Sequence, residues 1–169
     1  MRKLKAVLAA ALAAWALAAP AAGADLAALT RAAEQGDARA QAMLGLVYHL
    51  GRGAEQDGAR AAFWYLKAAG QGVAVAQTNL GVLYREGTGV ARDDRAAAAW
   101  FRRAAEQGDA AAHNYLGVAY REGMGVARDD EAAAGWFGKA AGQGDARGAA
   151  NLGYMYRTGR GVARDDAAA

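Results

Sequence analysis

Two stretches of the chain are nearly identical and decide the fold: residues 80–107 read LGVLYREGTGVARDDRAAAAWFRRAAEQ, and residues 116–143 read LGVAYREGMGVARDDEAAAGWFGKAAGQ. They lie 36 residues apart, and shorter matches recur at the same spacing on both sides. Self-similarity at a fixed period of this length indicates a repeat architecture, in which each unit packs on its neighbours. We therefore treat the chain after residue 24 as one array of units.

Four features recur in register in this array. The Leu-Gly pairs begin at Leu44, Leu80, Leu116 and Leu152. The tyrosines that follow them are Tyr48, Tyr84, Tyr120 and Tyr156. Loops with two glycines begin at Gly51, Gly87, Gly123 and Gly159, and the tryptophans are Trp64, Trp100 and Trp136. Recurrence without gaps predicts that every unit has the same local structure.

Each unit reads as two helices. In the first, which we call the A helix, Ala76, Leu80 and Leu83 lie on one face at the i, i+4, i+7 spacing of an amphipathic helix. Aspartates precede it as N-caps and Gly87 ends it. The second, the B helix, begins near Asp93–Asp94 and carries the Trp.

A glycine inside each A helix is unusual, because glycine costs about 1 kcal/mol relative to alanine at such a position. The glycines concerned include Gly81 and its equivalents. We expect a Trp or Tyr ring of a neighbouring helix to lie on the backbone there. The Val after each loop, such as Val90, is expected to pack against the helix pair and to hold the loop close to it.

The pattern predicts an all-α fold, a right-handed α-solenoid of stacked antiparallel helix pairs. Composition agrees, since alanine is the commonest residue and isoleucine is absent. The predicted layout is a B-type cap helix at 25–36, full repeats at 37–72, 73–108 and 109–144, and a partial fourth repeat at 145–169.

The first 24 residues have the tripartite pattern of a secretory signal peptide. A basic start (Arg2, Lys3, Lys5) precedes the apolar run Ala6 to Ala19, and Ala22-Gly23-Ala24 offers a cleavage site before Asp25. An uncleaved signal anchor is the alternative, although the run is short for a transmembrane helix. We therefore expect a periplasmic or secreted bacterial protein with no stable membrane span after cleavage.

Charge follows from the same division of the chain. The net charge is +3, from 20 Lys and Arg against 17 Asp and Glu, and three of those basic residues precede Asp25. The remainder is therefore neutral overall, which removes the bulk-charge argument for nucleic-acid binding.

The repeated pattern L-G-x-x-Y-x-x-G-x-G-V-x-x-D, followed by A-x-x-W-F-x-x-A-A-x-Q-G-D, resembles the Sel-one-like repeat (SLR) family, a relative of tetratricopeptide repeats. The resemblance covers essentially all of residues 25–169. It implies a superhelix of helical hairpins that serves as a protein-interaction scaffold, with frequent export of the bacterial members. It names no partner.

By similarity to tetratricopeptide repeats, a partner is expected on a concave surface lined by variable A-helix positions. The first row is Ala42, Thr78, Asn114 and Ala150, and the second is Leu46, Val82, Val118 and Tyr154. The third row is His49, Arg85, Arg121 and Arg157. Because arginine binds carboxylates through two hydrogen bonds, an acidic or carboxylate-terminated segment is the hypothesis.

The alternative for the third row is that its arginines pair with acidic residues of adjacent units, namely Glu86, Glu122 or the Asp-Asp loops. Exposed pairs of this kind contribute little, about 0–1 kcal/mol.

The sequence offers little for catalysis. The chain has no Ser and no Cys, hence no serine or thiolate nucleophile and no Cys-ligated metal. His49 and His113 occupy different places in their units, and the Asp-Asp pairs stand where helix caps are expected. The Gly-x-Gly loops do not extend to a phosphate-binding motif, because Arg92 stands at the third glycine position. We expect no catalytic residues, cofactor or metal.

At the C-terminus, residues 161–166 match the sequence that precedes the other B helices and predict a further one, but only Ala167 to Ala169 follow. Either the sequence is truncated, or a partner or a second copy covers the last A helix.

The leading function is thus a non-catalytic scaffold or adaptor in the cell envelope. The alternative is a cell-wall-linked enzyme or a peptidoglycan- or β-lactam-binding protein, as some exported SLR relatives have been called.

Overall fold

A computed structural model describes residues 24–163 and residue 165, and every regular element in this part of the chain is an α-helix. Most of the predicted signal peptide and most of the last residues lie outside it. The helices are α2 (Ala24–Glu34), α3 (Ala38–Leu50), α4 (Gly58–Gly70), α5 (Ala74–Glu86), α6 (Asp94–Glu106), α7 (Ala110–Glu122), α8 (Asp130–Gly142) and α9 (Ala146–Thr158).

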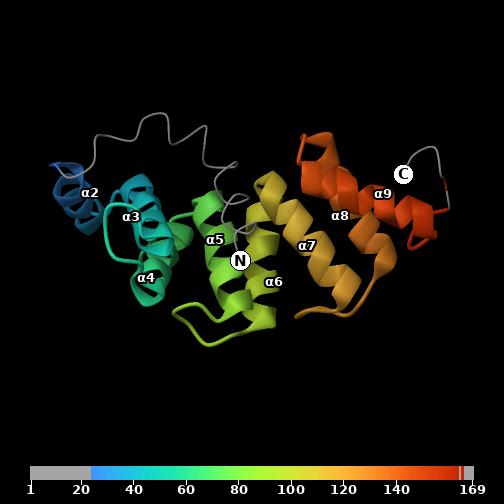
Figure 1. Ribbon diagram of the computed structural model, residues 1–169, viewed down its shortest axis with the longest axis horizontal. Coiled ribbons are helices and arrows are strands. Elements are labelled where there is room, and N and C mark those ends of the chain that lie inside the picture. Colours follow the sequence, from blue (N-terminus) through green and yellow to red (C-terminus); the bar gives the residue numbers. More distant parts are fainter. Residues whose placement is uncertain (1–23, 164, 166–169) are drawn as a thin grey trace.

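The helices follow one another in chain order along the longest axis of the molecule, from α2 at one end to α9 at the other (Figure 1). Each packs on its neighbours in sequence, and two pairs of successive A helices also touch, α3 with α5 and α7 with α9. The all-α solenoid predicted from the repeat is therefore confirmed. The A helices are α3, α5, α7 and α9, and the B helices are α2, α4, α6 and α8.

The helix ends have the predicted chemistry. Aspartate side chains accept backbone N–H groups at the start of six helices, from Asp37, Asp57, Asp93, Asp109, Asp129 and Asp145. α5 is instead preceded by an apolar residue, Val73, which makes no such bond. The A helices end on left-handed glycines with φ between 66° and 71°, at Gly51, Gly87, Gly123 and Gly159.

The second glycine of each later loop joins one unit to the unit before it. Gly125 has a φ of +71°, and a Cβ there would collide with the backbone carbonyl of Asp94, at the start of the preceding B helix. Gly89 lies in the same way against Gly58, and Gly161 against Asp130. Val90 and Val162 pack into core clusters, so at these two loops the valine holds the loop close to the helices as predicted.

The glycines inside the A helices make room for aromatic rings. A Cβ on Gly81 or Gly117 would lie 2.6 Å from the ring of Phe101 or Phe137, and one on Gly45 would lie 2.6 Å from Tyr65. The predicted close approach is thus confirmed, but the ring belongs to the residue after each Trp and is Phe in two units. The tryptophans pack elsewhere: Trp64 lies in a cluster with Ala33 and Leu44, which joins the cap helix to the first unit.

Small side chains set how closely the helices pack. Most of the buried apolar residues are alanines, and several are fully inaccessible, among them Ala33, Ala61, Ala68, Ala76, Ala104, Ala112, Ala133 and Ala140. The larger buried side chains, such as Leu80, Leu116 and Phe137, fill the spaces between helix axes. The alanine content therefore serves close packing between units, as well as helix formation.

Candidate functional site

Four of the predicted binding residues lie inside the solenoid. Thr78, Val82 and Asn114 are between 1% and 5% exposed, and His49 is 7% exposed. The prediction that these side chains line an open surface is wrong, because helices of the next units cover them: Val82, for example, lies in a core cluster with Phe101 and Leu116.

Two of these buried side chains connect units through hydrogen bonds. The Thr78 hydroxyl donates to Asp109 Oδ1 at 3.0 Å, and this oxygen also caps α7. Asn114 Oδ1 accepts from Asn151 Nδ2 at 2.8 Å. Thr78 and Asn114 therefore position neighbouring helices and are not available to a partner.

The other residues of the predicted binding rows are at least partly accessible to solvent. Val118 is half-buried and packs against a core cluster, whereas Tyr154 is 38% exposed. Arg85 and Arg121 are half-buried and Arg157 is exposed. Exposure rises along the third row because the first three members are followed by another A helix, whereas α9 is the last described helix. We call Arg85, Arg121 and Arg157 the inner arginine row.

Arg85, near the end of α5, is held by an acid and a ring. Its guanidinium lies 3.3 Å from Glu86 Oε1 and 4.9 Å from the centre of the Tyr115 ring. The guanidinium of Arg147 lies 5.3 Å from the centre of the same ring. Tyr115 on α7 therefore contacts two cations, one from each neighbouring A helix, and these contacts restrict how the guanidinium of Arg85 can turn.

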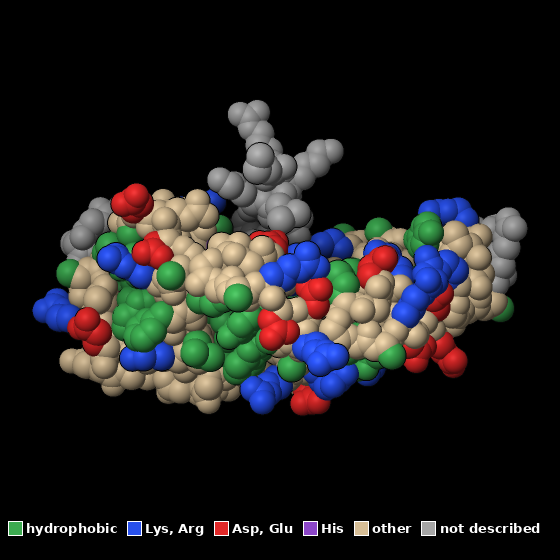
Figure 2. All heavy atoms as spheres, turned by 90° about the horizontal axis from the view of Figure 1, so that it is seen from below, with side chains coloured by type: hydrophobic (Ala, Val, Ile, Leu, Met, Phe, Trp, Pro, Cys, Tyr) green, Lys and Arg blue, Asp and Glu red, His purple; other side chains and the backbone are tan. Residues whose placement is uncertain are grey.

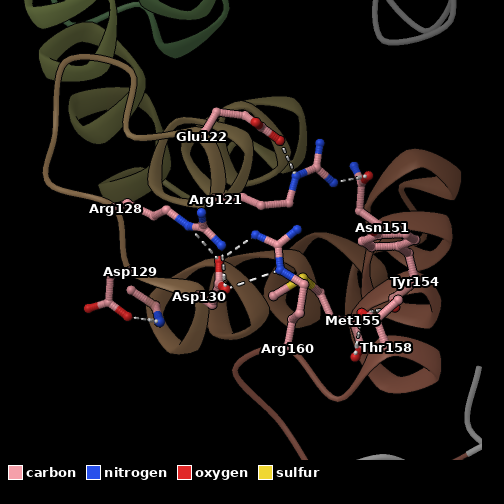
Figure 3. A network of polar contacts seen from close by, with 11 residues as sticks. Arg121, Glu122, Arg128, Asp129, Asp130, Asn151, Tyr154, Met155, Thr158 and Arg160 are labelled. Carbon is pink, nitrogen blue, oxygen red and sulfur yellow. Dashed lines mark hydrogen bonds and ion pairs between the residues drawn. The ribbon is translucent and has the colours of Figure 1, made fainter.

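Arg121 is held in a similar way one unit further on (Figure 3). Its Nε donates to Glu122 Oε1 at 2.8 Å, and its Nη1 donates to Asn151 Oδ1 at 3.0 Å. Its guanidinium also lies 5.5 Å from the centre of the Phe137 ring. Arg85 and Arg121 therefore do pair with glutamate, but each pairs with the residue that follows it in the same unit, and not with a glutamate of an adjacent unit.

Arg157 differs, because Thr158 stands where the two preceding units have Glu86 and Glu122. Within the described residues its guanidinium contacts only the Tyr154 ring, at 5.9 Å from the ring centre. The row thus carries more uncompensated positive charge at its α9 end.

A small hollow beside Arg85 is lined by polar and aromatic side chains, including Asp94, Phe101, Tyr115 and Met124. Its cavity volume is about 10 Å³. A cavity of roughly this size holds one water molecule. The hollow is therefore too small to take a side chain of a partner.

The Asp-Asp pairs do not form acid–base dyads. Asp129 caps α8, while Asp130 accepts hydrogen bonds from Arg128 and from Arg160 of the next unit (Figure 3). Hydrogen bonds from Arg160 and then Arg128 lower the pKa of Asp130 to about 2. A carboxyl that holds its proton so weakly remains charged, and here it links two units.

Sequence reasoning missed a ladder of side-chain amides between units. Gln41 Nε2 donates to the Ala33 carbonyl at 3.0 Å, and Gln77 Nε2 donates to the Ala69 carbonyl at 3.1 Å. His113, at the same place in the third unit, makes the corresponding contact to the Ala105 carbonyl at 3.0 Å. These bonds satisfy carbonyls at the C-terminal ends of B helices. Recurrence of Gln41, Gln77 and His113 at the repeat spacing was the signal that could have revealed them.

The contact between the first two units, which we call the first joint, contains unpaired polar atoms. His49 Nδ1, the Tyr65 hydroxyl and Asn79 Nδ2 are buried without a hydrogen-bond partner. The rings of His49 and Tyr65 meet edge to face with their centres 6.0 Å apart. At the equivalent places the third joint has Arg121, Phe137 and Asn151, and there the Arg–Asn hydrogen bond is made. The first joint is therefore less well satisfied than the third.

The first joint should make stability depend on pH. Burial lowers the pKa of His49 from 6.5, and the nearby Glu86 carboxylate offsets this only in part. A group whose pKa is lower in the folded state stabilises the fold above its unfolded pKa, and this contribution is lost as the pH falls. We expect the free energy of unfolding of His113→Gln to fall between about pH 7 and about pH 5, below the ordinary histidine pKa.

His113→Gln is the chosen background because glutamine already occupies this place in Gln41 and Gln77, and because His49 is then the only histidine. Adding His49→Gln should remove part of the pH dependence, measured by urea unfolding at each pH. An unchanged pH dependence would contradict the role of His49.

The face of the molecule drawn in Figure 2 shows no large region of one charge. Basic and acidic side chains are interspersed over the face drawn in Figure 2. In the described part of the chain, no three His, Asp or Glu side chains gather as ligands for a metal ion. None of the described helices is long and apolar enough to cross a bilayer.

A comparison with models of protein families shows which family this chain belongs to. The Sel1 repeat model matches residues 38–73, 74–109, 110–145 and 146–169, each starting one residue later than the division drawn from the sequence. The chain belongs to the Sel1 repeat family. Sel1 repeat proteins generally act as protein-interaction scaffolds. A comparison with curated proteins found no significant match.

Solved structures of Sel1 repeat proteins are similar to this one. A protective antigen of uropathogenic Escherichia coli that displays an SLR fold is 50% identical, with a TM-score of 0.79. A Sel1 repeat protein from Oxalobacter formigenes is 41% identical, with a TM-score of 0.71. The matches cover 82% and 78% of this chain, but only 30% and 54% of those chains. The present chain thus spans about a third to a half of these two relatives.

A third structure shares the fold alone. Cysteine rich protein B of Helicobacter pylori is 21% identical, with a TM-score of 0.60, over 76% of this chain and 92% of that one.

Proposed function

We propose that this Sel1 repeat protein is a non-catalytic scaffold of the bacterial cell envelope, which binds an acidic segment of a partner protein along the inner arginine row. The observation that supports this most directly is the arrangement of the guanidinium groups. Those of Arg85 and Arg121 are oriented by ring contacts and by one glutamate each, and that of Arg157 has no acidic neighbour among the described residues.

An arginine with one pairing acid keeps N–H donors for a second acceptor, since the guanidinium has five. A partner carboxylate would therefore add to the existing pairs of Arg85 and Arg121 without breaking them. At Arg157 it would meet an uncompensated charge, so we place the strongest contact near α9. Tyr154, which is exposed beside Arg157, would contribute apolar contact area.

The envelope location rests on the signal-like residues 1–24, whose pattern is that of an exported chain. Self-association through α9 remains a further hypothesis from the sequence.

The test is capture in the cell that makes the protein. The full chain is crosslinked in intact cells, and complexes from the periplasmic and extracellular fractions are identified by mass spectrometry. We expect Arg85→Ala, Arg121→Ala and Arg157→Ala together to lose the partner, because all three charge contacts are removed, while helicity by circular dichroism is kept.

The matched control replaces three arginines outside the row, Arg52, Arg95 and Arg128, by alanine, and should retain the partner. Capture that survives loss of the inner arginine row would contradict the proposed surface. Retention of peptidoglycan or of a labelled β-lactam by the purified protein would instead favour the cell-wall alternative.

A further inference from the structure

One side of α4 exposes two large apolar side chains, which are rare on the surface of the described residues. Phe63 is 51% exposed and Leu66 is 49% exposed, and Tyr154 on α9 is the only other exposed large hydrophobic side chain among the described residues. Residues three apart on a helix are neighbours on its surface, so Phe63 and Leu66 form one patch. We call these two residues the α4 patch.

The α4 patch belongs to the first unit alone. At the two equivalent places the second unit has Ala99 and Arg102, and the third has Gly135 and Gly138. The repeat therefore folds without apolar side chains at these positions, and packing within the solenoid does not explain Phe63 and Leu66. An exposed apolar patch that the fold does not need is typical of an interaction site.

A cation lies beside the patch, and cations recur at the same register in the two flanking B helices. Lys67 Nζ lies 4.7 Å from the centre of the Phe63 ring and 5.2 Å from that of Trp64. Arg31 on α2 and Arg103 on α6 occupy the same place in their helices, and the guanidinium of Arg103 lies 4.6 Å from the centre of the Trp100 ring. Toward the end of the molecule that carries α2 to α4, Figure 2 shows hydrophobic side chains next to basic ones.

These three cations form no ion pair with any described residue, unlike Arg85 and Arg121. In the B helices before and after α4, the exposed Ala27 and Ala99 stand where Phe63 stands in α4. The α4 patch thus carries Lys67 on its own helix, and the two flanking B helices carry an unpaired arginine at the same register. This arrangement is complementary to an acidic surface with an apolar centre.

We propose that the α4 patch is a second docking surface, which binds an acidic amphipathic segment of a partner protein. The apolar side chains of the segment would cover Phe63 and Leu66, and its carboxylates would meet Arg31, Lys67 and Arg103. The surface is carried by B helices, whereas the inner arginine row is on A helices. The two proposals can therefore fail independently.

Two other occupants fit less well. A second copy of the chain, related by a two-fold axis through the patch, would bring the same cations together. An anionic bilayer would satisfy the charges, but stable membrane binding needs more buried apolar area than two side chains offer. Both remain outcomes that the experiment can detect.

The experiment uses three labelled amphipathic helical peptides of equal length. Their apolar faces are identical, and their polar faces carry Glu, Gln or Lys. Binding to the purified protein is measured by fluorescence anisotropy. We expect the Glu peptide to bind more tightly than the Gln peptide, and the Lys peptide to bind least.

Two variants test the two parts of the surface. Phe63→Ala with Leu66→Ala should weaken binding of the Glu peptide about tenfold, because the apolar centre is lost. Lys67→Glu with Arg103→Glu should reverse the order, so that the Lys peptide binds more tightly. The matched control is Lys139→Glu with Arg52→Glu: Lys139 lies on Trp136 as Lys67 lies on Trp64, but next to glycines. It should leave the order unchanged.

Equal binding of the Glu and Gln peptides, or a Glu peptide that binds the alanine variant as tightly, would overturn the proposal. So would binding to phosphatidylglycerol vesicles that requires Phe63 and Leu66, or a dimer in light scattering that these two substitutions dissociate. Folding is checked by thermal unfolding, and the alanine variant should remain folded because both positions are exposed and alanine favours helix.

Discussion

Gly125→Ala is expected to lower the free energy of unfolding by about 2–5 kcal/mol, the sum of backbone strain and a collision between units. The φ of Gly125 is +71°, where an L-residue with a Cβ is strained. The added Cβ would also collide with the Asp94 carbonyl and lie 2.7 Å from the amide nitrogen of Arg95. Backbone atoms at a helix start cannot move aside as a flexible side chain can, so the loop itself would have to lift.

Gly53→Ala is the matched control. Gly53 is the same loop glycine in the first unit, with a φ of +87°, but a Cβ there would meet nothing within 4 Å. Its substitution should cost only the strain of the left-handed conformation, about 1–2 kcal/mol. Urea unfolding of both variants isolates the contact between units as the difference between them. Equal losses would mean that this contact adds nothing to stability.

Phe137→Ala is the second large effect, with an expected loss of about 3–5 kcal/mol in the free energy of unfolding. The Phe137 side chain is fully buried, and its ring lies on the backbone of α7 at Gly117. Truncation leaves a cavity between α7 and α8, which the surrounding helices can fill only in part.

Gly117→Ala should also destabilise, by about 1–3 kcal/mol, although alanine is the better helix former. The reason is that its Cβ would lie 2.6 Å from Cε1 of the Phe137 ring. When the ring is absent, the same methyl group has room. The loss in free energy of unfolding for the double variant, Phe137→Ala with Gly117→Ala, should therefore be smaller than the sum of the two single losses, by about 1 kcal/mol or more.

Gly135→Ala serves as the control for this cycle. Gly135 is an exposed glycine inside α8, and a Cβ there would meet nothing within 4 Å. This substitution should stabilise the protein by up to about 1 kcal/mol through helix propensity alone. Additive losses in the cycle, or a stabilising Gly117→Ala, would contradict the close contact between Gly117 and Phe137.

Local patterns could be read from the sequence because each depends on a few neighbouring residues. The aspartates before the helices act as caps and the loop glycines end the A helices, as their spacing predicted. The prediction of a Trp or Tyr ring on Gly81 was wrong, because the ring there belongs to Phe101, the residue after Trp100. Their Cα–Cβ directions differ by about 100° around the helix. Which of them faces the preceding A helix depends on how the two helices are rotated against each other.

The predicted binding rows show the same limit of sequence reasoning, because exposure also depends on how neighbouring helices pack. Thr78 and Arg85 both stand on α5 at variable positions, and sequence reasoning placed them on one open surface. Thr78 is buried against the cap of α7, whereas Arg85 remains accessible. The amide ladder through Gln41 and Gln77 was overlooked for a related reason, because its acceptors are backbone carbonyls, which leave no trace in the sequence.

By itself, the sequence determined that this protein is an array of helix pairs with a 36-residue period, and it determined which aspartates cap helices and which glycines end the A helices. These features follow from local propensity, capping and regular recurrence. Only the tertiary structure decided which polar side chains join the units and which remain accessible, as Thr78 and Arg85 show. The physical reason is that exposure depends on the distance and rotation between neighbouring helices, and these are set by the packing of alanines, glycines and rings across every joint.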